Sequence, residues 1–128
     1  MTEQLKLAFL APEQQTEFVT WVNENSRNAY DPAILGYPTL KVLRSYNSHT
    51  IAYLPTHQCL VLESVAMNPH ATELEKAQAL RDLVKGAELL ASSFRLKEIY
   101  FIASDEQVKE LAERRGFEEV RCMRLKLQ

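Results

Sequence analysis

The sequence contains little glycine and little cysteine. Average usage of about 7% would give roughly nine glycines in a chain of this length, but there are three, Gly36, Gly86 and Gly116, far apart. No glycine-rich loop of the kind that binds dinucleotides or nucleoside triphosphates can be formed from them. Cys59 and Cys122 form no CxxC pair, and no histidine is placed to make a metal-ligand set with them. We therefore expect free thiols in a reducing compartment and no metal site.

The sequence also lacks a strong net charge. The formal charge is -2, with 25% charged and 46% hydrophobic residues, as in an average soluble globular domain. A basic cluster near the C-terminus is interrupted by two glutamates; it consists of Arg114, Arg115, Arg121, Arg124 and Lys126. We therefore expect no nucleic-acid partner. The apolar stretch 5–11 is short and contains Lys6, so we expect no signal peptide, no membrane span and a cytoplasmic location.

Hydrophobic periodicity predicts one domain, residues 1–128, in which strands and helices alternate. The expected strands are 5–10, 40–46, 50–54, 59–67, 98–103 and 120–127. The expected helices are 12–25, a single turn at 31–36, 72–94 and 104–115. Residues 47–49 and 55–58 are predicted to be turns. The order βα(α)βββαβαβ indicates a mixed α+β fold.

The two later helices carry signals for their ends. Thr72 and Glu75 have the spacing of a capping box, and so do Ser104 and Gln107. Gly116 is expected just past the last helix, with the next aromatic side chain folding back onto that helix.

The three histidines fall outside these elements. His49 and His57 lie in predicted turns, and His70 precedes the long helix. We expect each to be exposed and to take no part in chemistry, because no Ser/His/Asp set can be derived from the spacing.

Residues 99–117 form a predicted strand, a capped helix and the sequence Ala-Glu-Arg-Arg-Gly-Phe. This segment resembles the closing motif of the GNAT superfamily of acyl-CoA-dependent N-acyltransferases. The order of elements agrees with that family over nearly the whole chain, whereas matching residues are confined to the last helix and its Gly-Phe. The resemblance implies a GNAT-like fold, with a central mixed sheet flanked by helices. In that fold, strands 59–67 and 98–103 are parallel neighbours joined by the long helix.

The resemblance also implies a site. Family members hold the pyrophosphate of coenzyme A on main-chain N–H groups at the start of the long helix, within a glycine-containing pattern. The positions that correspond to cofactor-binding residues are Val65, Met67, Thr72, Glu75, Lys76, Ala77 and Asp105. Glu63 is the candidate catalytic residue, since family members often place a glutamate here to help deprotonate the acceptor amine; the alternative is an edge residue or one paired with a basic neighbour. The substrate-side candidates are Arg27, Tyr30, Asp31 and Tyr37.

Three features depart from the family pattern. The segment 69–77 contains no glycine, and Glu73 and Glu75 bring negative charge to the place of the phosphates. Ala112 stands where a tyrosine often acts as general acid. Eleven residues follow Phe117, so the usual final hairpin is expected to be reduced to one strand.

Two classes of function remain. One is an N-acyltransferase that transfers an acyl group from acyl-CoA to a small-molecule or peptide amine. The other is a GNAT-like domain with weakened or lost catalysis that serves as a ligand-binding or interaction module. The departures favour the second and predict weak or absent binding of acetyl-CoA or CoA. The apolar strand 120–127 lacks a hairpin partner, which predicts a homodimer through this strand unless its basic residues protect the edge.

Overall fold

The computed structural model describes residues 4–25, 31–103 and 105–128, which form a mixed α+β structure. Along the chain the elements are β1 (Lys6–Phe9), η1 (Pro12–Gln14), α1 (Gln15–Asn25), η2 (Pro32–Gly36), β2 (Lys41–Tyr46), β3 (Thr50–Thr56), β4 (Leu60–Leu62), α2 (Glu73–Ser93), β5 (Ile99–Phe101) and α3 (Glu106–Arg114). The predicted order of elements is therefore confirmed as far as the last helix.

The first half of the chain is an antiparallel sheet of order β1-β2-β3 covered by α1 on one face. Phe18 and Val22, four residues apart on α1, pack on Val42 of β2. The ring of Phe18, 1% exposed, meets the ring of Tyr53 edge-on at 5.4 Å. The core of this half depends on these few contacts between one helix and one face of the sheet.

The second half consists of β4 and β5, joined by α2 and followed by α3. Leu60 pairs with Ile99 and Leu62 with Phe101 in a parallel arrangement, so the predicted parallel neighbours are confirmed. α2 begins at the predicted Thr72 cap. The ring of Phe101 lies 5.9 Å from that of Phe117, which connects the end of α3 to β5.

The end of α3 confirms the predicted glycine stop. Gly116 has a φ of +96°, and its N–H donates to the carbonyl of Glu113 while the Phe117 N–H donates to that of Ala112. This pair of bonds is the Schellman motif. At the other end of α3 the cap is Asp105, whose carboxylate accepts from the Val108 N–H, so the predicted cap at Ser104 is wrong; Ser104 itself lies outside the described residues.

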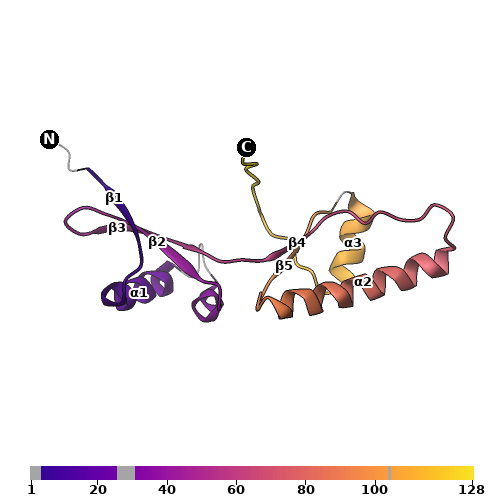
Figure 1. Cartoon of the computed structure of the whole chain (residues 1–128), viewed down its shortest axis with the longest axis horizontal. Helices are drawn as coiled ribbons and strands as arrows, with labels where there is room; N and C mark the ends of the chain where they lie inside the picture. Colours follow the sequence, from indigo (N-terminus) through magenta and orange to yellow (C-terminus); the bar gives the residue numbers. More distant parts are fainter. Residues whose placement is uncertain (1–3, 26–30, 104) are drawn as a thin grey trace.

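The central sheet expected from the family is not formed by the described residues: β1–β3 and β4–β5 make two separate sheets. Figure 1 shows them end to end along the long axis of the molecule. The predicted turn at 55–58 is wrong, because β3 continues to Thr56 and the chain runs on into β4 without reversing.

Two predicted strands are also shorter or absent. Only Leu60–Leu62 of the expected strand 59–67 is a strand, and 120–127 forms none and is exposed. A strand needs a neighbour along its whole length to satisfy its main-chain groups, and the described part of β5 is three residues long. The described helices include none long and apolar enough to cross a membrane.

Candidate functional site

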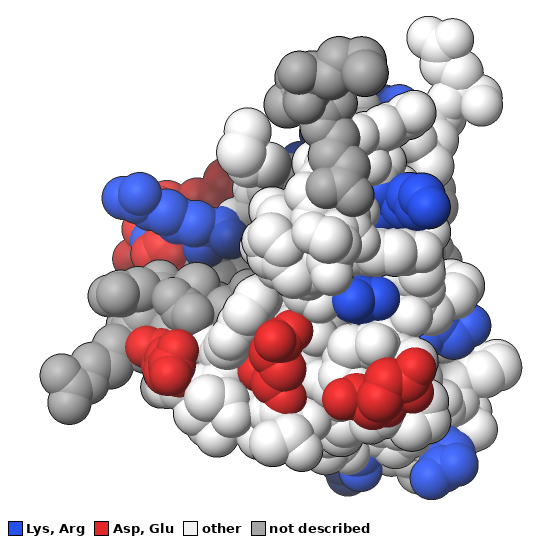
Figure 2. All heavy atoms as spheres, turned by 90° about the vertical axis from the view of Figure 1, so that its left-hand side faces the viewer, with Lys and Arg blue, Asp and Glu red and all other residues white. Residues whose placement is uncertain are grey.

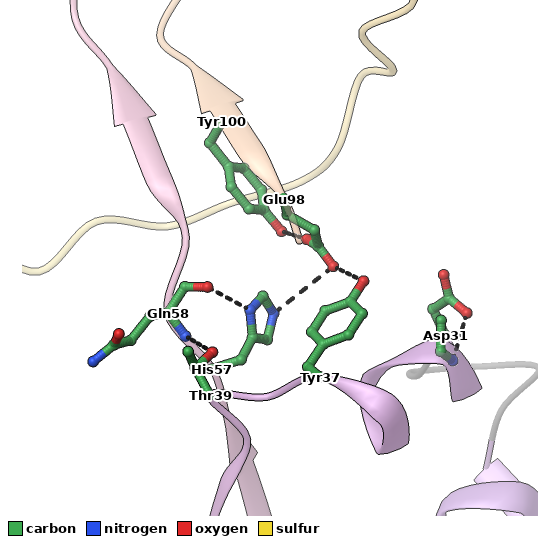
Figure 3. A network of polar contacts seen from close by, with 8 residues as sticks. Asp31, Tyr37, Thr39, His57, Gln58, Glu98 and Tyr100 are labelled. Carbon is green, nitrogen blue, oxygen red and sulfur yellow. Dashed lines mark hydrogen bonds and ion pairs between the residues drawn. The ribbon is translucent and has the colours of Figure 1, made fainter. Parts of the chain in front are cut away.

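A network of polar side chains lies where the two halves meet, and Glu98 is at its centre (Figure 3). The hydroxyl of Tyr37, just after η2, donates to Glu98 Oε2 at 2.5 Å. The hydroxyl of Tyr100 on β5 donates to Oε1 at 2.8 Å. His57 Nε2 lies 3.9 Å from Oε2, and its ring packs edge-on against Tyr37 at 5.0 Å. A residue just after η2, one from the β3–β4 connection and one from β5 therefore converge on one carboxylate.

The carboxylate holds both phenols in their neutral form. The pKa of Tyr37 is raised from 10.0 to about 12, mainly by the hydrogen bond to Glu98 and secondly by burial. The same two causes raise the pKa of Tyr100 to about 12. A phenol donating to a carboxylate loses that bond when it ionises. These hydroxyls are therefore firm donors near neutral pH and poor proton sources for a reaction.

Neither nucleophilic nor metal chemistry is favoured at the network. Burial, and then the charge of Glu98, raise the pKa of the half-buried Cys59 thiol, whereas a reactive cysteine needs a lowered one. Among the described residues no group of three or more histidines, cysteines or carboxylates could hold a metal ion. The arrangement suits holding two halves of the chain in a fixed relation.

The predicted cofactor residues at the start of α2 lie together, but they bond to one another. The Thr72 N–H donates to Glu75 Oε1 at 2.9 Å, and the Glu75 N–H donates to Thr72 Oγ1 at 3.1 Å. These bonds lower the pKa of Glu75. Lys76 Nζ lies 3.5 Å from the carboxylate of Glu73. Ala77 follows on the next turn and is exposed.

The remaining predicted site residues do not join this group. Glu63 follows β4 in a segment without regular structure and is exposed, so its predicted place within a strand among apolar neighbours is wrong. Val65 and Met67 are exposed in the same segment. Asp105 caps α3, and Asp31 caps η2 by accepting from the Ala33 N–H at 3.0 Å (Figure 3).

Two of the four substrate-side candidates, Arg27 and Tyr30, lie outside the described residues. Of the other two, only Tyr37 reaches the network.

Sequence reasoning missed three members of the network: His57, Glu98 and Tyr100. The prediction that His57 is exposed is wrong, because it is half-buried between Tyr37 and Glu98. One signal was available in the sequence: Glu98 and Tyr100 are two residues apart at the start of a strand, and that spacing places both on the same face.

No protein-family model matches this sequence, and no curated protein is similar to it at a significant level. Among solved structures, the chain is similar to the ribosomal-protein-alanine N-acetyltransferase from Brucella melitensis biovar Abortus 2308. The identity is 11% and the TM-score 0.36, over 98% of this chain and 100% of that chain. A likeness of this degree supports no conclusion about activity.

Proposed function

We propose that this chain is a GNAT-like domain in which acyl-CoA binding and catalysis are weakened or lost, and that it acts as an interaction module. The parallel pair β4–β5 with α2 between them, and α3 ending at Gly116, support the GNAT-like part of the proposal. These are the elements that the sequence resemblance implies.

The capped start of α2 carries the proposal of weakened cofactor binding. A pyrophosphate at a helix N-terminus needs free main-chain N–H groups and a positive end of the helix dipole. Here the Glu75 carboxylate already accepts from the Thr72 N–H, and the Glu75 N–H is taken by Thr72 Oγ1. The positive charge of Lys76 is paired with Glu73. Two carboxylates thus occupy the region where the phosphates would lie.

Exposed apolar side chains support the interaction role. Leu7, Phe9 and Leu54, which share one face of the β1–β3 sheet, are 76%, 67% and 59% exposed. Soluble monomers seldom leave large contiguous apolar areas in water unless those areas bind something.

Calorimetry with CoA and acetyl-CoA tests the proposal. We expect no binding at micromolar ligand, and a gain of at least about tenfold in affinity in the double variant Glu73→Gln, Glu75→Gln, since each change removes a negative charge and keeps the side-chain shape. The matched control is Glu88→Gln, an exposed carboxylate in the later part of α2, which should change nothing. A micromolar dissociation constant for acetyl-CoA in the unmodified protein, together with transfer of the acetyl group to an amine, would establish the acyltransferase instead.

A further inference from the structure

Each of the two sheets ends in a strand that lacks a second neighbour. Among the described residues, β3 pairs with β2 alone and β4 pairs with β5 alone. Parallel sheets are normally larger and covered on both faces, and a pair of three-residue strands is too small to be stable by itself. Free edges of this kind are usually paired or covered. β3 and β4 each have one unpaired edge, so pairing a β3 strand with a β4 strand would satisfy both.

The connection between these strands is held extended. The Gln58 N–H donates to Thr39 Oγ1 at 3.0 Å, and the ring of His57 packs on Tyr37 at 5.0 Å. Thr56 Oγ1 donates to the carbonyl of Lys41 at 2.8 Å. Pairing β3 with β4 of the same chain requires a reversal at 57–59, which would break the contacts of His57 and Gln58.

The antiparallel sheet also has an uncovered apolar face. Phe9, Leu43 and Leu54 are direct partners across the three strands and share this face, and Leu7 joins them two residues before Phe9. Val42 lies on the opposite face, against α1. Leu7, Phe9 and Leu54 are 76%, 67% and 59% exposed. Figure 2 views this end of the molecule: uncharged residues make up much of the surface, acidic side chains lie in a row below its middle, and most basic ones lie toward the sides and the bottom.

A matching apolar stripe lies on α2. Leu83, Leu90 and Phe94, the C-cap of α2, are spaced by seven and four residues, which places them along one side of the helix. They are 54%, 47% and 65% exposed. The stripe lies next to the buried Ala91, whereas Leu89 lies on a different side. A helix with an apolar stripe is the usual cover for an apolar sheet face.

The exposed area gives the size of the missing contact. The chain exposes 10720 Å², whereas a compact monomer of 14.7 kDa exposes about 6,900 Å². The excess is about 3,800 Å² per chain and includes the extended C-terminal segment. Obligate dimers bury about 2,000–5,000 Å² in total over both chains. The excess exposed area of two chains is therefore large enough to form an interface of this size.

We propose that two copies of this chain exchange their C-terminal halves about residues 57–59. In the exchanged dimer, β4 of each copy pairs with the β3 edge of the other, and the Leu83, Leu90 and Phe94 stripe covers the other copy's uncovered sheet face. Exchange of identical elements is a low-cost route to a closed two-fold dimer. The inference rests on the proposed interaction role, for which it names the partner as a second copy of this chain.

The first experiment measures the mass of the full chain by sedimentation equilibrium at tens of micromolar protein. We expect twice 14.7 kDa. Inserting Asn-Gly after Gln58 supplies a hairpin turn, which lets β4 fold back in its own chain, and should convert the dimer to a monomer. Leu125→Lys, in the C-terminal segment, should leave the mass unchanged. A monomer with a radius of gyration near 14 Å, or an insertion variant that stays dimeric, would overturn the exchange.

The second experiment compares two adjacent leucines on α2. Leu90→Lys should weaken association by about tenfold or more, because it places a charge in the apolar contact, whereas Leu89→Lys should not. Both leucines are exposed, at 47% and 73%, so neither change disturbs the fold of one half. Equal effects of the two changes would contradict the proposed contact.

Calorimetry separates this inference from the proposed loss of cofactor binding. If the protein is a dimer and binds acetyl-CoA at micromolar concentration, the proposed exchange stands and the proposed loss of cofactor binding is wrong. If it is a compact monomer that does not bind acetyl-CoA, the exchange is wrong and the loss of cofactor binding stands.

Discussion

Replacing Glu98 with glutamine tests the polar network with little change in side-chain size. The carboxylate accepts from Tyr37 and Tyr100, and its side chain is 29% exposed. The two phenols donate to different carboxylate oxygens, whereas the amide of glutamine offers one acceptor oxygen and an NH2 group that can only donate, and it carries no charge. We expect the pKa of each phenol to fall from about 12 toward its ordinary value near 10, because the charge that favours the neutral phenol is gone.

The change should also lower stability. A hydrogen bond to a charged group contributes about 1.5–3 kcal/mol and a neutral one about 0.5–1.5 kcal/mol, so the bond that the amide oxygen still accepts loses about 1 kcal/mol, and the phenol that faces the NH2 group loses its acceptor. Because the carboxylate is partly exposed, we expect about 1–2 kcal/mol for both bonds together. At this chain length that lowers Tm by roughly 3–10 °C.

The pH dependence has a definite sign. The folded-state pKa of Tyr37 and Tyr100 lies above the unfolded value, so the network stabilises the fold fully below pH 10 and loses that contribution as the pH rises through about 12. The stability gap between the unmodified protein and Glu98→Gln should therefore close at strongly alkaline pH. Ultraviolet titration of tyrosinate in the native state is the direct assay, and Glu88→Gln is the matched control. Identical tyrosine titrations for the unmodified protein and Glu98→Gln would refute the assignment of the network.

Four further substitutions test the fold. Thr72→Ala removes the α2 cap and should lower stability by about 1 kcal/mol and return the pKa of Glu75 toward its ordinary value, as followed by NMR titration. Gly116→Ala should destabilise the protein by about 1 kcal/mol because of the positive φ at this position, whereas Gly86→Ala in the middle of α2 should stabilise it by about 0.5–1 kcal/mol. Neither added Cβ meets an atom within 4 Å. Urea unfolding of the two variants therefore compares backbone effects alone. Phe18→Ala should cost about 3–5 kcal/mol in the same assay, and a loss below about 1 kcal/mol would show that the α1 core is not closed around this ring.

The features predicted correctly from the sequence depend on residues close together in the chain. The α2 capping box joins Thr72 to a residue three positions later, and the end of α3 joins Gly116 to Glu113. Such helix ends are determined by residues a few positions apart, so they can be recognised from the local sequence. The hairpin of β2 and β3 is likewise fixed by strands on either side of a short turn.

The features that were missed or wrong depend on partners far away in sequence. Tyr37 reaches Glu98 across 61 positions, and no local pattern specifies that contact. The turn predicted at 55–58 does not form at its first residues, because Pro55 is accommodated within β3. The expected strand at 120–127 has the right alternation of side chains but no neighbouring strand among the described residues. Alternating side chains show that a segment is able to form a strand, but whether it does so depends on a neighbouring strand that the rest of the fold provides.

The polar network and the proposed exchange are connected through the same few residues. His57 belongs to the connection between β3 and β4, and its contacts with Tyr37 and Glu98 help to keep that connection extended. Weakening the network should therefore make reversal at 57–59 easier and shift the protein from dimer toward monomer. Glu98→Gln then has two readouts: the tyrosine titration reports the network, and the sedimentation mass reports the exchange. A variant that loses the raised tyrosine pKa values and stays wholly dimeric on dilution would show that the network does not hold the connection open, and that the strand edges and the α2 stripe alone decide the assembly.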